Sequence, residues 1–314
     1  MESVRSLRSS GCRLTWIAPV AMCVVMLAWG SRCLAQVPKL YFTNDWYDKI
    51  ERCRLDGSAR EDLVTTGSSP RGIALDVVGG KMYWTDWSEN RVKRSDLNGS
   101  NVETLLDKSS GEPLSIALDL PRAKIYWVQN ESPSIWRANL DGTAEELVVQ
   151  GVGGDGPVAL AVDYIGQKLY WTDDRDEGSI RRASLDGSGE EFVLCTGLVN
   201  ANSLALDLAG QTVYWADNGL DMIQRCGFDG SGKEALVTLA EDPHAICLDL
   251  DAGKMYWTEY FLGTMQRSDL DGSDIETIID SGIRDVWGIA IVPEPAALSL
   301  LALGGLAVLR RRGH

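Results

Sequence analysis

The sequence predicts an all-β fold, a six-bladed β-propeller, and three observations lead to this prediction. A six-residue stretch typified by Lys81–Asp86 (KMYWTD) occurs six times, with its tyrosine at positions 41, 83, 126, 170, 214 and 256. Each copy lies in a unit of four short apolar runs separated by turn residues. The incomplete units at the two ends of the repeat region complement each other. A fixed period of about 40–45 residues with strand-like content is typical of propellers.

The second unit shows how the predicted strands follow one another. Inner and second strands are expected over 72–76 and 82–86, and third and fourth strands over 92–97 and 102–106. The last two are joined by Asn98-Gly99-Ser100, and Asn-Gly and Asp-Gly are the strongest short hairpin signals because both residues need a positive φ. Asp-Gly pairs recur at this place at 56–57, 141–142, 186–187, 229–230 and 271–272. Four antiparallel strands per unit make one propeller blade.

The ends of the repeat region predict how the ring closes. The first unit begins with its second strand at Leu40, whereas the last inner-strand run, Trp287–Ile291, has no blade after it. We therefore expect a C-terminal strand over 286–291 to complete the first blade. This pairing removes the open sheet edges that an unclosed ring would leave.

The N-terminal segment is predicted to be a signal peptide. Three arginines precede an apolar run over 14–28, and Cys33-Leu34-Ala35 provides a cleavage site with small residues at the required positions. We therefore expect residues 1–35 to be removed and a propeller to occupy residues 36–292. An uncleaved anchor helix is the alternative.

The C-terminal segment has three parts in a fixed order. Val292-Pro293-Glu294-Pro295 is followed by an apolar run over 296–309 and by three arginines at 310–312. The run is short for a spanning helix, which needs about 20 residues, but a terminal arginine cluster fits the positive-inside rule. Residues 293–314 thus resemble the PEP-CTERM sorting tail of exported bacterial proteins. The resemblance implies processing by an exosortase-type enzyme, a short transmembrane helix as the only membrane contact, and delivery to the cell surface or extracellular matrix.

The repeated stretch itself also resembles a known motif. Tyr-Trp-Thr-Asp is complete at 83–86 and 170–173 and degenerate elsewhere, most of all at Tyr126-Trp127-Val128-Gln129. The units, over about residues 37–292, resemble the class B (YWTD) repeats of low-density lipoprotein receptor-type proteins. The resemblance implies that the motif is structural and occupies the second strand of each blade. It also implies that the loops after this strand share the top face with the residues that precede each inner strand.

Three recurring sets of polar residues are interpreted as parts of the frame. We expect the Asp-Gly-Ser turns to be Asx turns, with calcium binding as the alternative, also for the acidic loop at 173–178. The inner-strand aspartates are expected to cap turns, with an axial cation ring as the alternative: Asp76, Asp119, Asp163, Asp207 and Asp249. The third-strand arginines are expected to stack on the motif Trp or Phe and to pair with the acidic end of the second strand, rather than to form an anion ring: Arg52, Arg94, Arg137, Arg182, Arg225 and Arg267.

Four cysteines lie outside the predicted signal peptide: Cys53, Cys195, Cys226 and Cys247. Cys53 and Cys226 occupy the same repeat position in different units, so they are expected to lie far apart. We therefore interpret the cysteines as small buried hydrophobic residues, with a disulfide as the alternative.

The positions that differ between units are the candidate binding site. Six residues precede the inner strands at the mouth of the axis: Arg71, Leu114, Val158, Asn202, His244 and Trp287. The loops after the motif in the first, second and sixth units, which become neighbours in a closed ring, add further aromatic side chains. Aromatic residues gathered on one rim are typical of binding surfaces, with inward packing as the alternative. We predict a top-face ligand site of Trp46, Tyr47, Trp87, Tyr260, Phe261, Trp287, Arg71, Asn202 and His244.

Composition favours a binding module over an enzyme. Residues 36–292 carry 43 acidic and 23 basic residues, which argues against nucleic acid or anionic membrane as the main partner. His244 is the only histidine outside the tail, so a histidine zinc site is excluded and a catalytic base has no evident nucleophile. We predict a monomeric, non-catalytic module without cofactor or metal that binds protein or polysaccharide. A structural matrix component and a propeller lactonase or other hydrolase are the alternatives, because the fold alone does not decide function.

Overall fold

The computed structural model describes residues 38–292 except 108–110, 152–155, 174–177 and 190, and for 191–196 it describes the backbone alone. The predicted signal peptide over 1–35 and the predicted tail over 293–314, with its hydrophobic helix and arginine cluster, lie outside these residues. Within the described ranges, no helix is both long enough and apolar enough to cross a membrane.

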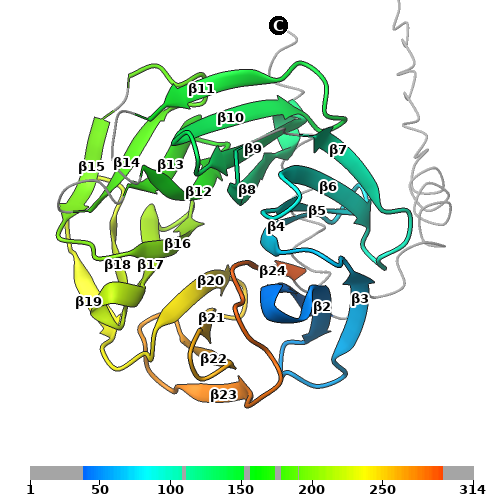
Figure 1. The fold of residues 1–314 in the computed structure, drawn as a ribbon. Coiled ribbons are helices and arrows are strands. Elements are labelled where there is room, and N and C mark those ends of the chain that lie inside the picture. Colours follow the sequence, from blue (N-terminus) through cyan, green and yellow to red (C-terminus); the bar gives the residue numbers. More distant parts are fainter. Residues whose placement is uncertain (1–37, 108–110, 152–155, 174–177, 190, 293–314) are drawn as a thin grey trace, which may run out of the picture. The chain divides into compact units, whose positions relative to one another are not determined.

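Six four-stranded antiparallel sheets surround a central axis, as the repeats predicted (Figure 1). The first three blades consist of β24 (Ile289–Val292), β1 (Lys39–Asn44), β2 (Lys49–Arg54) and β3 (Glu61–Thr65); β4 (Pro70–Asp76), β5 (Lys81–Asp86), β6 (Arg91–Asp96) and β7 (Glu103–Asp107); and β8 (Pro113–Asp119), β9 (Lys124–Gln129), β10 (Ser134–Asn139) and β11 (Glu146–Gln150).

The other three blades have the same strand order, from the axis outward. They consist of β12 (Pro157–Asp163), β13 (Lys168–Asp173), β14 (Ser179–Ser184) and β15 (Glu191–Thr196); β16 (Ala201–Asp207), β17 (Thr212–Asp217), β18 (Met222–Gly227) and β19 (Glu234–Val237); and β20 (Pro243–Asp249), β21 (Lys254–Glu259), β22 (Thr264–Asp269) and β23 (Glu276–Ile279). Three short 3-10 helices, η1 (Asp45–Tyr47), η2 (Leu120–Arg122) and η3 (Asn218–Leu220), lie in loops.

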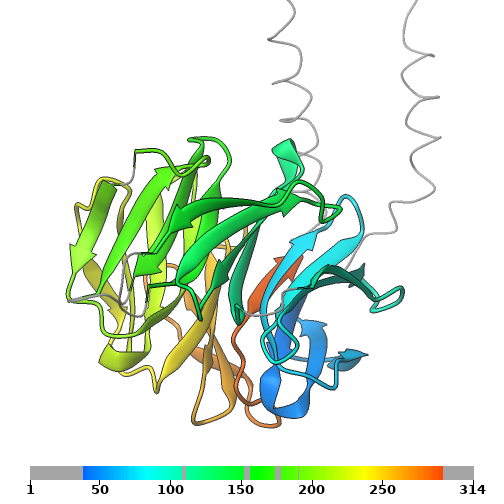
Figure 2. The same cartoon turned by 45° about the horizontal axis from the view of Figure 1, so that its top comes forward.

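The ring closes through the C-terminal strand, as predicted. β24 pairs antiparallel with β1, with Lys39 opposite Val292, and Figures 1 and 2 show red β24 beside the blue strands of the first blade. The ladder begins at Ile289, later than the predicted start at 286. Residues before it still bond to the first blade, because Thr43 N of β1 donates to Gly288 O at 3.0 Å and Asp45 N of η1 to Asp285 O at 3.2 Å.

Two faces of the ring are distinguished below. The top face carries the loops between second and third strands and the connectors that lead into the next inner strand. The bottom face carries the loops between first and second strands and between third and fourth strands. In the first blade the two ends of the described chain replace a first loop at the bottom face.

Aromatic residues of the motif hold neighbouring blades together. Neighbouring residues on a strand point to opposite faces of the sheet, so the motif Tyr faces one neighbouring blade and the following aromatic residue faces the other. Each motif Tyr shares a buried cluster with the aromatic residue of the next blade: Tyr41 with Trp84, Tyr83 with Trp127, Tyr126 with Trp171, Tyr170 with Trp215, Tyr214 with Trp257, and Tyr256 with Phe42. Each of the six seams therefore contains a buried cluster with the same pair of motif positions.

The recurring arginines are structural, but their predicted partners were wrong. Each lies opposite the motif Tyr, as Arg94 lies opposite Tyr83, and so occupies the Tyr side of the blade rather than the Trp side. In the five blades whose fourth-strand side chains are described, its guanidinium bonds to a glutamate of that strand, such as Glu103 at 2.7 Å, not to the acidic end of the second strand. It also donates to a carbonyl of the next blade; the acceptors, in ring order from Arg52, belong to Leu97, Leu140, Leu185, Phe228, Leu270 and Leu55.

A second set of bonds joins the inner strands near the axis. Thr43 Oγ1 donates to Arg71 O of the next blade at 2.7 Å and accepts from Gly288 N at 3.0 Å. Two blades have Val128 or Ala216 in place of this threonine. In both, an inner-strand serine takes over: Ser115 Oγ accepts from Leu160 N, and Ser203 Oγ accepts from Ile246 N, each at 3.1 Å.

The predicted turn chemistry is confirmed. The Asx residue of each Asp-Gly or Asn-Gly turn accepts a bond from the backbone N–H two residues on, as Asp56 does from Ser58 N at 2.9 Å. The inner-strand aspartates cap their turns by accepting a bond from the backbone N–H three residues on, as Asp76 does from Gly79 N at 2.7 Å. Cys53, Cys226 and Cys247 are buried, as expected, and Cys53 and Cys247 form no disulfide, whereas the side chain of Cys195 is not described.

We predict that the third-strand arginine contributes to stability through its seam bonds. Arg94→Met keeps much of the apolar stem but removes the donor to Leu140 O, so the free energy of unfolding in urea should fall by about 1–3 kcal/mol. Arg91→Met, in the same strand, removes only surface ion pairs and should change it by no more than about 0.5 kcal/mol. Equal losses in the two variants would contradict the assignment of a seam role to Arg94.

Candidate functional site

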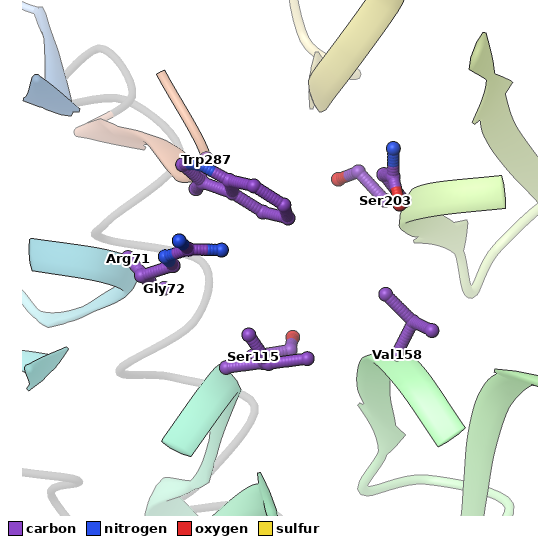
Figure 3. Close-up of a pocket in the computed structure, with 8 residues that line it drawn as sticks. Arg71, Gly72, Ser115, Val158, Ser203 and Trp287 are labelled. Atoms are coloured by element: carbon purple, nitrogen blue, oxygen red, sulfur yellow. The ribbon is translucent and has the colours of Figure 1, made fainter. Parts of the chain in front are cut away.

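The six positions at the axial mouth do converge on the top face. Five of them, Arg71, Leu114, Val158, Asn202 and Trp287, line one cavity together with residues of the inner strands. Figure 3 shows Arg71 and Trp287 on one side of this cavity, with Val158 and Ser203 across from them. Its volume is about 30 Å³, which has room for one or two water molecules but not for a sugar ring. Any larger ligand therefore contacts the rim rather than the axis.

Arg71 forms the centre of the aromatic cluster. Its guanidinium carbon lies 3.8 Å from the centroid of the Trp287 ring and 4.6 Å from that of Trp87. Asp45 Oδ2 lies 3.4 Å from Arg71 Nε, and burial lowers the pKa of Arg71 while Asp45 opposes that shift. Burial also raises the pKa of Asp45. The guanidinium thus links the first, second and sixth blades through stacking and charge.

His244 is the one mouth residue that does not line the cavity. It is 3% exposed and makes edge contacts with Trp287 and Tyr260, at centroid distances of 4.1 and 5.1 Å. Burial, assisted by the positive charge of Arg71, lowers the pKa of His244 to about 3. The imidazole is therefore neutral at physiological pH and packs as an aromatic residue. A buried base of this basicity is poorly suited to general base catalysis.

Six aromatic residues form what we call the aromatic rim: Trp46, Tyr47, Trp87, Tyr260, Phe261 and Trp287. Tyr260 continues the stack outward, with its ring centroid 5.4 Å from that of Phe261. Phe261 is 81% exposed, Trp46 56% and Tyr47 47%, whereas Trp87, Tyr260 and Trp287 are half-buried. The inner members of the rim thus support outer members that face solvent. The aromatic rim as a whole is therefore neither fully exposed nor fully packed inward.

Short 3-10 and turn geometry positions the outer aromatic residues. Trp46 and Tyr47 lie in η1, which ends at Asp48 in the left-handed conformation. Tyr260 N donates to Asp242 O at 3.0 Å and Gly263 N to Glu259 O, and these bonds fix the loop that carries Phe261. Asn202 lies at the start of β16 and shares the cavity with Arg71, but no ring contact joins it to the rim.

Sequence comparison between units missed several contributors to this surface. Arg284 stacks on Trp46, with its guanidinium carbon 3.8 Å from the ring centroid, and lies in the connector before β24. Leu262, on the loop of Phe261, is 52% exposed. Asp45, which pairs with Arg71, is another contributor outside the predicted site. The acidic loop residues 174–177 lie outside the described residues, and in the described part no cluster of metal-ligating side chains is found.

Asp217, at the top end of β17, has a pKa well above the usual value for an aspartate. It accepts bonds from Leu220 N at 3.2 Å and Val199 N at 3.1 Å. The equivalent Asp86 is paired with Lys93 at 2.7 Å, but the corresponding third-strand residue in this blade is the neutral Gln224. Burial raises the pKa of Asp217 to about 6, against the influence of its backbone donors.

Comparisons with known proteins agree with this geometry. Residues 80–120, one period of the repeat from β5 to β8, match the family model for the low-density lipoprotein receptor repeat class B. Over 71 residues the chain is 46% identical to low-density lipoprotein receptor-related protein 5 of Homo sapiens and 45% identical to that of Mus musculus. These matches cover 22% of this chain and only 4% of each receptor.

The similarity to solved structures extends over most of the ring. A chain in the crystal structure of a nidogen/laminin complex has a TM-score of 0.73 and 25% identity, over 81% of this chain and 98% of that one. TolB from Acinetobacter baumannii (TM-score 0.63, 12% identity, covering 87% and 72%) and putative TolB from Agrobacterium tumefaciens (0.60, 16%, 80% and 92%) share the fold alone. The chain thus contains a YWTD-type six-bladed propeller similar to the matched segment of these receptor-related proteins and to the propeller in the nidogen/laminin structure.

We predict a stability difference that depends on the charge of Asp217. Its pKa of about 6 in the folded state exceeds the unfolded value of about 4, so the protonated form is favoured by folding. Its contribution to the free energy of unfolding should be largest below about pH 4 and should decrease by roughly 2–3 kcal/mol as the pH rises to about 6. Subtracting the unfolding curve of Asp217→Asn from that of the wild type should reveal this decrease.

Asp229→Asn provides the control with the opposite sign. Bonds from Ser231 lower the pKa of the exposed Asp229, so its stabilising contribution is present at neutral pH and is lost on acidification. If the difference in free energy of unfolding between the wild type and Asp217→Asn stays constant between pH 4 and 7, folding does not raise the pKa of this carboxyl group.

Proposed function

We propose that this propeller is a non-catalytic binding module that captures a protein ligand on the aromatic rim. The observation that carries the proposal is a continuous series of cation–π and edge contacts that supports the exposed Phe261; its members are Trp87, Arg71, Trp287, His244 and Tyr260. Aromatic and arginine side chains held rigid by their neighbours lose little conformational freedom on binding, and such residues supply most of the affinity in protein interfaces.

Three further points support a protein ligand. The cavity at the axis admits only water-sized molecules, so a substrate cannot be enclosed there, and His244 is buried and neutral. The domain is strongly acidic, which favours a partner with exposed cationic groups. The similar propeller in the nidogen/laminin structure belongs to a complex between two proteins. Polysaccharide stacked on the rim, a purely structural matrix role and a hydrolase are the competing functions.

We propose further that the module is exported from a bacterial cell after cleavage behind Ala35. Residues 36–292 then form a monomeric propeller, and residues 293–314 direct an exosortase-type enzyme to the protein at the cell surface or in the matrix. Arginines precede an apolar run at the N-terminal end of the sequence, and an apolar run precedes three arginines at the C-terminal end. Both patterns support this route. The exported protein should begin at Gln36, which N-terminal sequencing or intact-mass measurement will test; a retained N-terminus would contradict the cleavage.

The ligand proposal predicts a selective loss of binding. Trp46→Ala/Phe261→Ala removes two exposed aromatic side chains without opening the stack beneath them, and should weaken capture of the ligand from envelope and matrix extracts by roughly 30-fold or more. Residues 36–292 suffice for the experiment because they contain every strand of the closed ring.

Val102→Ala/Ile275→Ala is the matched control, since these side chains are half-exposed on the bottom face. It should bind as the wild type does. Capture abolished by protease treatment of the extract, but not by glycosidases, would identify a protein ligand, and the reverse would identify polysaccharide. Equal capture by the rim variant and the wild type would exclude the aromatic rim as the binding surface.

A further inference from the structure

We propose that the bottom face of the propeller rests directly on a lipid bilayer when the C-terminal tail is inserted, so that the aromatic rim points away from the membrane. This goes beyond the tail-only membrane contact predicted from the sequence. It rests on the proposed insertion of the tail, and it is independent of the identity of the ligand.

The first observation is the place where the chain leaves the ring. β24 is the inner strand of the first blade, and its last residue, Val292, lies directly opposite Lys39 at the start of β1. The same pairing occurs in the second blade between Asp76 and Lys81, which flank a loop on the bottom face. The described chain therefore ends at the bottom face, next to the axis.

The second observation is the length of the connection. Only Pro293-Glu294-Pro295 separates Val292 from the apolar run that begins at Ala296. The Cα atoms of Val292 and Ala296 are four residue steps apart, which span about 14 Å at most in an extended chain. If the run enters a bilayer, the end of β24 at the bottom face therefore lies within that distance of the hydrocarbon core. This distance accommodates a headgroup layer of about 5–8 Å and little water between protein and membrane.

The third observation is the apolar character of the bottom loops around the axis. In five blades, the loop between first and second strands begins with an apolar residue directly after the capping aspartate. Four of these loops expose an apolar side chain: Val78 is 81% exposed, Ile165 67%, Leu250 42% and Leu120 39%. Repetition around the axis distinguishes this set from the single exposed apolar residues found on most proteins.

The distribution of charge on the bottom face indicates which kind of bilayer these loops can contact. In four of the five blades, the aspartate before the loop is matched by a lysine at the start of the next strand: Asp76 and Lys81, Asp119 and Lys124, Asp163 and Lys168, and Asp249 and Lys254. Two of these lysines form their ion pairs with third-strand aspartates, Lys81 with Asp96 and Lys254 with Asp269. The inner loops thus carry charges of both signs, whereas the outer Asp-Gly turns are acidic. A bilayer of zwitterionic headgroups fits this pattern, because apolar side chains can enter it without charge repulsion.

Lipid photo-cross-linking tests the proposal. The chain beginning at Gln36 and retaining its tail would be reconstituted in phosphatidylcholine and phosphatidylethanolamine vesicles that contain a photoactivatable phospholipid. Mass spectrometry would then locate the labelled peptides. We expect labelling of the tail and of the loops over 77–80, 164–167 and 250–253. Val78→Ser/Ile165→Ser should reduce labelling of these loops by roughly tenfold, because the apolar contact with lipid is lost.

The matched control is Val199→Ser/Leu239→Ser, which changes two side chains that are 50% and 89% exposed on the top face. It should leave the labelling unchanged. Labelling confined to the tail, or equal labelling of both faces, would overturn the proposed orientation. A tail without label would show that its insertion fails, and this outcome is separate from any result on ligand capture.

Discussion

The buried clusters that combine the motif tyrosine of one blade with the aromatic residue of the next are the packing on which the ring depends. Because Tyr and Trp are neighbours on one strand, a single strand anchors its blade on both sides. The arginine opposite the tyrosine and the threonine or serine near the axis then satisfy backbone groups at two points of the same seam. The side chains of the motif serve these interblade contacts, so the loops can differ between blades without affecting them.

The candidate site is a product of ring closure rather than of any one blade. Trp287 belongs to the segment that leads into β24, yet it stacks on Arg71 of the second blade and meets His244 of the sixth. Asp45, from the first blade, completes the arrangement by pairing with Arg71. An open ring would separate these residues. Fold stability and the shape of the rim are therefore linked through the same short segment.

The sequence was sufficient to predict the architecture because its signals are local and repeated six times. The period gave the blade count, Asp-Gly pairs gave the hairpins, and the unmatched strands at the two ends gave the closure. Side-chain partners across a seam were harder to predict. The arginines were predicted on the Trp side of the blade, but they lie on the Tyr side. The face to which a strand residue points depends on the pairing register, and a shift of one residue moves its side chain to the opposite face. Arg284 and the burial of His244 could not be predicted, since they depend on a connector without a counterpart in other units.

The six seams have a consequence for where the chain can be cut. The seam between the last and first blades uses the same bonds as the others, with Arg267 donating to Leu55 O and Tyr256 packed against Phe42. Covalent continuity therefore contributes no special contact at any one seam. New termini placed in another bottom loop, with the old ends joined, would leave every interblade contact in place. The propeller should therefore tolerate circular permutation at these loops.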